Sequence, residues 1–291
     1  MTSDRFATLK FDRKVTAPLA ALWQAWLSPS ARALWAAPAP SVTVDFLESD
    51  PKVGGREVSI CRVEGEPDIR VEGGWLDLDP KCRSVSYEVV SCEGVSQSAA
   101  LVTASFQDDG PGSRIEVTVQ LSSLAEDMRK GYEQGFGAGL ANLGGVAERV
   151  MVLEREINAP AAAVYGAWSD PEALPKWWGP DGFSCRTDRI DLTPGGEWVF
   201  DMIAADGTVF PNHHKYSAFG PDRIAYTLHW GENGPKHADA WAEFIDLGGK
   251  TSVILSMAFV TQKEHDEAKG FGAYELGLQT LGKLAKHVGA P

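Results

Sequence analysis

The chain carries the same passage twice. Residues 11–38 read FDRKVTAPLAALWQAWLSPSARALWAAP and align without a gap with residues 153–180, LEREINAPAAAVYGAWSDPEALPKWWGP; 11 of the 28 positions are identical, which indicates a duplication. The C-terminal parts of the two halves also align, at Gly139 with Gly277 and Leu143 with Leu281. A repeat of about 140 residues has the length of a whole domain rather than of a solenoid unit. We therefore predict two copies of one domain, at residues 1–150 and 151–291.

Each copy shows the same order of predicted elements. A strand precedes a proline at a typical first helical position, Pro18 or Pro160, and two short helices follow. About six segments then alternate between apolar and polar residues, as strands of an antiparallel sheet do. Two capping boxes predict the start of a long C-terminal helix in each copy, Ser123-x-x-Glu126 and Thr261-x-x-Glu264. The predicted fold class is α+β, in which a curved antiparallel sheet wraps around a long helix.

Composition and motifs argue against several kinds of partner. The formal net charge of −13 repels phosphate, so we expect no nucleic-acid partner. No apolar run reaches about 18 residues, so we expect no membrane-spanning segment. The first residues lack the apolar core of a signal peptide, so we expect a cytoplasmic protein.

The sequence carries no recognisable signature of a metal or cofactor site. The four cysteines form no CxxC pair, and neither HExxH nor a nucleotide-binding glycine motif occurs. His213 and His214 are adjacent, so on a strand they point to opposite faces and cannot share one metal ion. We expect no metal site and no cofactor, and a surface position is the ordinary expectation for these histidines.

Five motifs of the second half resemble a known family when they are taken in order. They are PEALPKWWGPDGF, DLTPGGEW, DGTVFPN, GPDRIAYT and GLQTLGKLAKHV. Together they resemble the START-like SRPBCC superfamily, in the branch named after the C-terminal domain of the activator of the heat-shock-90 chaperone ATPase. Residues 1–150 follow the pattern more loosely, because WWGP becomes Trp35-Ala36-Ala37-Pro38 and EGEPDIR replaces the DGT loop. The resemblance implies two helix-grip domains with a pocket between sheet and long helix.

The paired indoles of WWGP have different expected roles. Trp177 is matched by Trp35 in the first copy, and we expect it to be a core residue. Trp178 has no counterpart. It is a second core residue, a lid at the mouth of a pocket, or an anchor for another protein.

Aromatic residues are concentrated in the second half, which holds 17 of the chain's Phe, Trp and Tyr residues. These side chains either line an apolar cavity or pack on one another and fill it. A histidine or tyrosine hydroxyl facing the cavity would orient a ligand. The candidate ligand-binding residues are Trp178, Met202, His214, Tyr216, Tyr226, Trp230, Trp241, Phe271 and Tyr274.

Three functions fit these observations. The first is the binding of a small apolar or aromatic molecule by the second domain, with the first domain as a structural partner. The second is an acid–base enzyme acting on a hydrophobic substrate, with His213 or His214 and tyrosines as the acid–base groups; no catalytic residues can be assigned from the sequence. The third is a chaperone-associated or other protein-interaction module, as the name of the family implies. A duplicated domain can mimic a homodimer of single domains, so we expect a monomer.

Overall fold

A computed structural model describes residues 5–289, and the chain divides into two compact units between Glu148 and Arg149. The first domain contains strands β1 (Phe6–Val15), β2 (Val42–Ser49), β3 (Arg56–Val63), β4 (Ile69–Asp79), β5 (Arg83–Cys92), β6 (Val95–Asp109) and β7 (Gly112–Ser123). Its helices are α1 (Leu19–Leu27), α2 (Pro29–Trp35) and α3 (Met128–Ala147).

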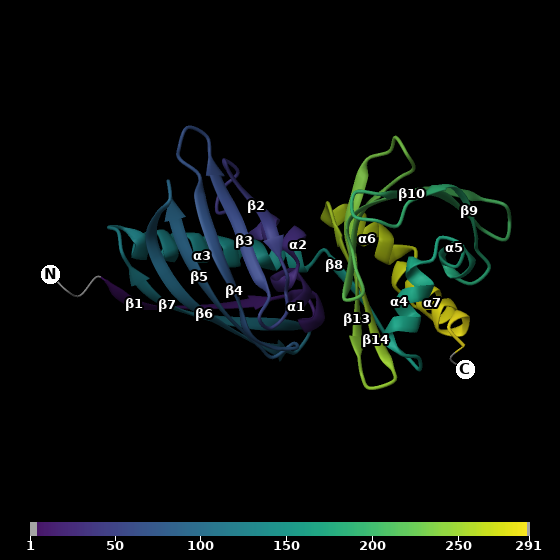
Figure 1. Cartoon of the computed structure of the whole chain (residues 1–291), viewed down its shortest axis with the longest axis horizontal. Helices are drawn as coiled ribbons and strands as arrows, with labels where there is room; N and C mark the ends of the chain where they lie inside the picture. Colours follow the sequence, from purple (N-terminus) through teal and green to yellow (C-terminus); the bar gives the residue numbers. More distant parts are fainter. Residues whose placement is uncertain (1–4, 290–291) are drawn as a thin grey trace. The chain divides into compact units, whose positions relative to one another are not determined.

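The first sheet is antiparallel with the strand order β1-β7-β6-β5-β4-β3-β2. Strands β2 to β7 follow one another as neighbours, while β1 pairs with β7, the last strand to be made. The 20-residue helix α3 runs along one side of this sheet and packs against α1, α2 and β1 (Figure 1). Each strand therefore has one face toward α3, here called the helix-facing side, and one outer face.

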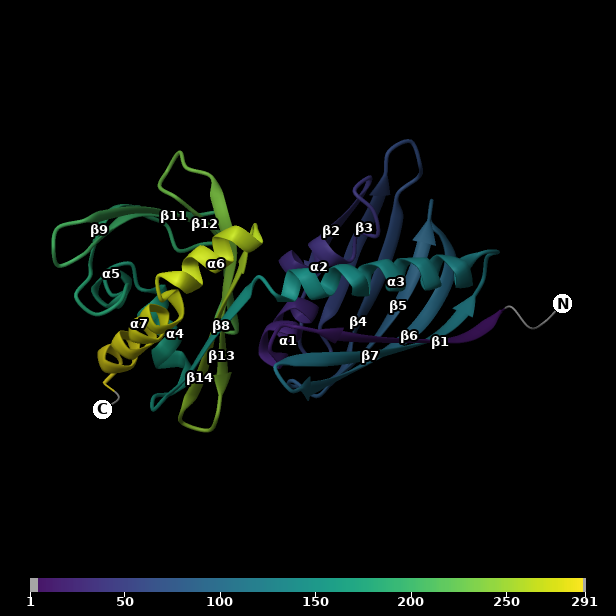
Figure 2. The ribbon, with the colours of Figure 1, turned by 180° about the vertical axis from the view of Figure 1, so that it is seen from behind.

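The second domain repeats this architecture with strands β8 (Val150–Ile157), β9 (Ser184–Ile190), β10 (Glu197–Ile203), β11 (Val209–Phe219), β12 (Arg223–His229), β13 (Lys236–Asp246) and β14 (Thr251–Phe259). Its helices are α4 (Ala161–Ser169), α5 (Leu174–Trp177), α6 (Gln262–Gly270) and α7 (Ala273–His287). The strand order β8-β14-β13-β12-β11-β10-β9 matches that of the first sheet. Figure 2 shows α6 and α7 on one side of this sheet. The predicted α+β fold with two tandem helix-grip domains is confirmed.

The C-terminal helix differs between the two copies. In the first copy α3 is continuous, whereas in the second the helix is interrupted between α6 and α7, where Gly272 adopts a left-handed conformation with φ of 85°. The capping box at Thr261 is confirmed, with both of its hydrogen bonds formed. The capping box predicted at Ser123 is wrong: Ser123 ends β7, and the next two backbone N–H groups donate to the carbonyl of Gln97.

Both copies keep one hydrogen bond that joins their two short helices. The indole Nε1 of Trp35 donates to the carbonyl of Ala25 at 2.8 Å, and that of Trp177 donates to Ala167 at 2.9 Å. Trp177 is buried, as predicted for a core residue. The matched tryptophan therefore serves the fold in both domains, so the unmatched Trp178 is the position that distinguishes them.

Within residues 5–289, no helix is both long and apolar enough to cross a membrane.

Candidate functional site

Strands β10, β11 and β12 of the second domain place aromatic and polar side chains on the helix-facing side. Trp198 pairs across the strands with His214, and Tyr216 pairs with Tyr226. Phe200 follows Trp198 by two residues and so faces the same way. We call these five residues together with Trp178 the aromatic cluster; all of them lie between the sheet and the helices of the second domain.

The imidazole of His214 lies at the centre of the aromatic cluster. Its ring is stacked on Tyr226, with a centroid distance of 4.7 Å and an angle of 29° between the planes. Phe200 meets it edge-on at 5.0 Å, and Trp178 and Trp198 do so at 5.4 and 5.5 Å. Four aromatic rings therefore surround one polar ring, and this arrangement leaves the imidazole in an apolar environment.

Three polar side chains of the aromatic cluster are almost completely buried. His214, Tyr216 and Tyr226 are each 3 % exposed or less, and their rings contact one another. The fully buried polar atoms that lack a hydrogen-bond partner among the described residues lie outside the cluster, at Ser123 Oγ, His213 Nδ1 and Ser256 Oγ.

Burial also fixes the protonation of these groups. It lowers the pKa of His214 well below its usual 6.5, with smaller contributions from neighbouring histidines. Burial likewise raises the pKa values of Tyr216 and Tyr226 above their usual 10. All three side chains are therefore neutral near pH 7. They can donate and accept hydrogen bonds without carrying charge.

Trp178 forms the outer edge of the aromatic cluster. It follows α5 as that helix's C-cap residue and is partly buried. Its indole contacts Trp168, Trp177 and Trp198 at centroid distances of 5.5 to 5.9 Å, in addition to His214. The structure thus places Trp178 between the core and solvent.

Helix α7 holds the turn that follows Trp178. The ammonium group of Lys283 donates to the carbonyls of Trp178, Pro180 and Phe183 at 3.2 to 3.4 Å. The side chain of Gln279 accepts a hydrogen bond from the backbone N–H of Asp181 at 3.2 Å. These contacts tie the turn that carries Trp178 to the helix across the cluster.

Met202 also packs near this turn. It lies on the same side of β10 as Phe200 and is partly buried. Its sulfur lies 3.4 Å from the position that a Cβ atom would take on Gly179. Five of the nine predicted residues are therefore brought together: Trp178, Met202, His214, Tyr216 and Tyr226.

The other four predicted residues lie elsewhere. Trp230 is 51 % exposed, because β12 ends at His229, and it stacks on His237. Trp241 faces the outer side of β13, because its neighbours Ala240 and Ala242 belong to the core, and its ring lies under the Arg223 guanidinium.

Phe271 and Tyr274 flank the interruption between α6 and α7. They are 63 % and 43 % exposed and are not brought to the aromatic cluster. Sequence reasoning in turn missed Trp198 and Phe200. Their signal is the two-residue spacing in the segment EWVFDMI, which places both on the side of Met202.

The predicted opposition of the adjacent histidines is confirmed. His213 faces the outer side, where its Nε2 lies 2.6 Å from a carboxylate oxygen of Glu197. The expectation of surface positions is wrong, because both histidines are 2 % exposed. Among residues 5–289 no group of three or more His, Cys, Asp and Glu side chains converges as metal ligands would.

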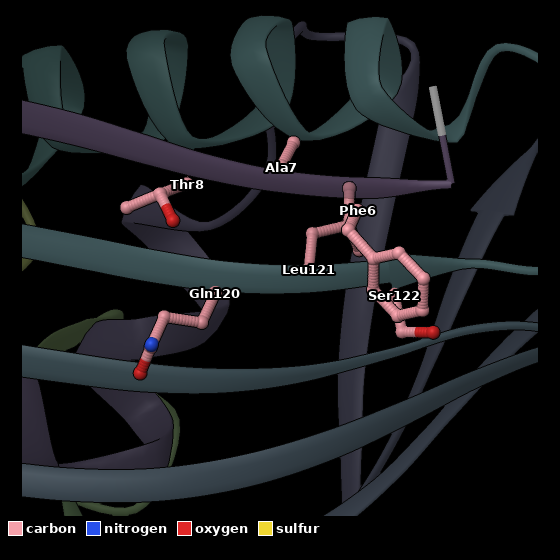
Figure 3. Close-up of a pocket in the computed structure, with 6 residues that line it drawn as sticks. All are labelled: Phe6, Ala7, Thr8, Gln120, Leu121 and Ser122. Atoms are coloured by element: carbon pink, nitrogen blue, oxygen red, sulfur yellow. The ribbon is translucent and has the colours of Figure 1, made fainter. Parts of the chain in front are cut away.

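A separate depression lies on the first domain between β1 and β7. It encloses about 320 Å³ and is lined by Phe6, Ala7, Thr8, Gln120, Leu121 and Ser122 (Figure 3). Phe6 is 74 % exposed, and the lining includes no charged group. The depression is open and offers few convergent polar groups, so it is a weaker candidate than the aromatic cluster.

Comparison with known protein families gives the same match in each half. The model of the family described as Activator of Hsp90 ATPase homolog 1-like protein matches residues 16–148 and again residues 158–289. No curated protein matches the chain.

Solved structures similar to this chain include single-domain and two-domain proteins. A protein from Rhizobium leguminosarum is 26 % identical, with a TM-score of 0.45, and the match covers 50 % of this chain and 95 % of that one. A protein from Arthrobacter aurescens is 20 % identical, with a TM-score of 0.47, covering 50 % and 89 %. The di-domain ARO/CYC BexL from the BE-7585A biosynthetic pathway is 18 % identical, with a TM-score of 0.38, covering 98 % and 99 %.

Proposed function

The chain belongs to the Activator of Hsp90 ATPase homolog 1-like family in both of its halves, and on that premise we propose that the second domain binds a small aromatic molecule between its sheet and α7. The observation that carries the proposal is the group of three buried polar side chains, His214, Tyr216 and Tyr226, which stand together among aromatic rings. A ligand with a hydroxyl or carbonyl group would form hydrogen bonds with them. Its ring would lie against the aromatic walls.

The aromatic side chains of the cluster favour a flat, neutral ligand. Trp198 and Phe200 are stacked at 3.7 Å, and Trp178 meets Trp198 edge-on. Such surfaces contribute about 0.5–1.5 kcal/mol per aromatic pair beyond the burial of area. A charged ligand would find no counter-ion among the three polar groups, which are neutral at pH 7.

Protonation favours binding over acid–base catalysis at this site. A general acid or base works best when its pKa lies near the working pH. Burial shifts the pKa of His214 downward and that of Tyr226 upward, so both move away from neutrality. We therefore assign these side chains to ligand recognition.

Trp178 is the proposed lid. It is the partly buried member of the cluster, and it sits on a turn that the side chains of Lys283 and Gln279 on α7 hold by hydrogen bonds. Rotation of this indole away from His214 would open the cluster from the solvent side. The first domain has Ala36 at the matched position and so lacks this lid.

The test is a pair of tyrosine substitutions that each remove one hydroxyl. Tyr226→Phe removes a buried hydroxyl of the cluster, while Tyr165→Phe makes the same chemical change beside Phe219 and Phe244, outside the cluster. Calorimetric titration with 1-naphthol should show binding to the wild type, weakened about three- to tenfold in Tyr226→Phe, as the loss of one hydrogen bond predicts. Tyr165→Phe should bind like the wild type.

Although Tyr226→Phe should weaken ligand binding, it should not lower the stability of the unliganded protein. Tyr226→Phe removes a polar atom from a buried position between aromatic rings, so the variant should unfold at the same or a higher urea concentration than the wild type. Native mass spectrometry of the protein from its own cells should show an adduct that Tyr226→Phe weakens. The proposal fails if 1-naphthol does not bind and no adduct is found, or if the two variants bind alike.

A further inference from the structure

The helix-facing side of the first sheet is far less filled than that of the second. In the second domain, Trp198 and Phe200 are almost completely buried on β10. In the first domain, the residues on this side of β2 to β5 are smaller and several remain partly exposed: Val44, Phe46, Ser59, Cys61, Val71, Ser86 and Glu88. The two copies therefore present different chemistry on the same face of the fold.

Glu88 is the acidic residue at the centre of this face. On β5 it pairs with Gly73 on one side and Ala100 on the other, so neither neighbour covers its side chain. Strand register places it on the helix-facing side, and the hydroxyl of Tyr132 on α3 is near enough to lower the pKa of its carboxyl group. Ser98 lies 3.4 Å from the same hydroxyl.

The other buried charges on this face neutralise one another. Arg32 and Glu57 form an ion pair, and the guanidinium lies over the rings of Phe46 and Trp75. Glu57 also accepts hydrogen bonds from the Trp75 indole at 2.9 Å and from Ser49 at 2.8 Å. Among the described residues Glu88 forms no ion pair, and the charge of Arg32 acts on it only at longer range.

Helix α3 has an open position near Tyr132. Gly135 lies three residues after Tyr132 and four before Gly139, both of which are on the buried face of α3. A Cβ atom built on Gly135 meets nothing within 4 Å, whereas one on Gly139, a turn later, would lie 3.3 Å from the carbonyl oxygen of Trp35.

Aromatic rings stand next to this space. Phe136 is stacked with Tyr132 at 6.0 Å and with Phe11 at 5.7 Å. The helix-facing side of the first sheet thus combines three features. They are the open position at Gly135, the carboxyl group of Glu88 and the aromatic ring of Phe136.

We propose that the first domain has its own binding site, for a small organic amine whose ammonium group pairs with Glu88 and Tyr132 and whose apolar part lies along Gly135 and Phe136. An ammonium supplies the positive charge that Glu88 lacks and forms charge-assisted hydrogen bonds with it. The faces of Phe136 and Tyr132 attract the same cation. The site is separate from the one proposed in the second domain, and its ligand differs in charge.

The acid–base properties of Glu88 agree with this assignment. Burial raises its pKa, while the Tyr132 hydrogen bond and the charge of Arg32 lower it to a smaller extent. The carboxylate is thus destabilised in the unliganded domain. A bound cation would remove that penalty, which is a source of binding energy that a neutral ligand cannot use.

The test compares two ligands of the same shape on the full-length protein. Calorimetric titrations use 2-phenylethylamine and its neutral counterpart 2-phenylethanol. The wild type should bind the amine about tenfold more tightly than the alcohol, the factor that one charge-assisted contact supplies. Glu88→Gln should abolish this preference while leaving the affinity for the alcohol within about twofold.

Two further variants separate a binding role from a structural one. Gly135→Leu fills the open position on α3 and should weaken both ligands by about tenfold or more, while its better helix propensity should keep the domain folded. Tyr226→Phe lies in the second domain and should leave amine binding unchanged.

Several outcomes would overturn the proposal. These are no amine binding by the wild type, equal binding of amine and alcohol, a preference that survives in Glu88→Gln, or amine binding lost in Tyr226→Phe. Binding of 1-naphthol by Glu88→Gln reports on the second domain alone, so failure at one site is distinguishable from failure at the other.

Discussion

His214 shows how one residue's surroundings decide its chemistry. Placed one position earlier, on the outer side of β11, a histidine meets the carboxylate of Glu197. Placed on the helix-facing side, it is stacked on Tyr226 and enclosed by rings. The same side chain is thus given an ionic partner at position 213 and an apolar one at position 214.

We predict that His214 makes the protein less stable in acid. Burial lowers its folded-state pKa, so below pH 6.5 the unfolded chain binds a proton that the folded chain does not. The stabilisation is complete above pH 6.5 and is lost as the pH falls, by up to about 1.4 kcal/mol per pH unit, until the folded-state pKa is reached. Urea unfolding at pH 7 and pH 5.5 measures the loss.

Two substitutions assign this pH dependence to its source. His214→Phe should reduce the change in unfolding free energy between the two pH values, leaving the part due to His229 and His237, whose pKa values burial also lowers, whereas His287→Gln, at an exposed position on α7, should leave the change as in the wild type. An equal loss of stability in His214→Phe and the wild type would contradict the prediction.

At the scale of elements, the patterns that held are those decided by near neighbours. Strand alternation correctly placed His213 and His214 on opposite faces, and the capping box at Thr261 formed as predicted. Sequence patterns predicted the wrong position or contact where a strand ended earlier than expected, or where a group distant in the sequence formed the hydrogen bond instead. Trp230 lies just beyond the end of β12, and the carbonyl of Gln97 takes the N–H groups after Ser123.

The unequal capping boxes lead to a prediction for the two helices. Thr261→Ala removes a side chain that accepts a hydrogen bond from the N–H of Glu264, and should lower the unfolding free energy by about 1 kcal/mol. Ser123→Ala is the matched control, because the buried Ser123 hydroxyl has no partner among the described residues. It should leave stability unchanged or raise it. Urea unfolding that shows equal losses in both variants would contradict this account.

At the scale of the whole molecule, the duplication could be predicted from the sequence, but the different binding roles proposed for the two domains could not. The matched Trp35 and Trp177 keep the same hydrogen bond, so the fold could be predicted from the repeat. The role of Glu88 could not be predicted, because it depends on Tyr132, 44 residues later, and on the separate pairing of Arg32 with Glu57. Contacts between distant segments leave no local pattern.

The duplication also leads to a prediction about assembly. A chain that already contains two copies of the domain does not need a second chain to bring two such domains together. We predict a monomer, with a mass of 31.4 kDa by light scattering. A mass near twice that value, unchanged on dilution, would show that the two copies do not replace a dimer.

The strand order also determines when each sheet can form during translation. Phe6 pairs with Ser122, and Met151 pairs with Met257. The first strand of each sheet can therefore pair only after the last strand has been synthesised. Pairing across such separations is slow, and domains fold as units while the ribosome continues. The remaining residues of the chain take roughly 7 to 29 seconds to translate at about 5–20 residues per second. During that time the first domain has all of its strands and α3, and it can meet a ligand before the second domain exists.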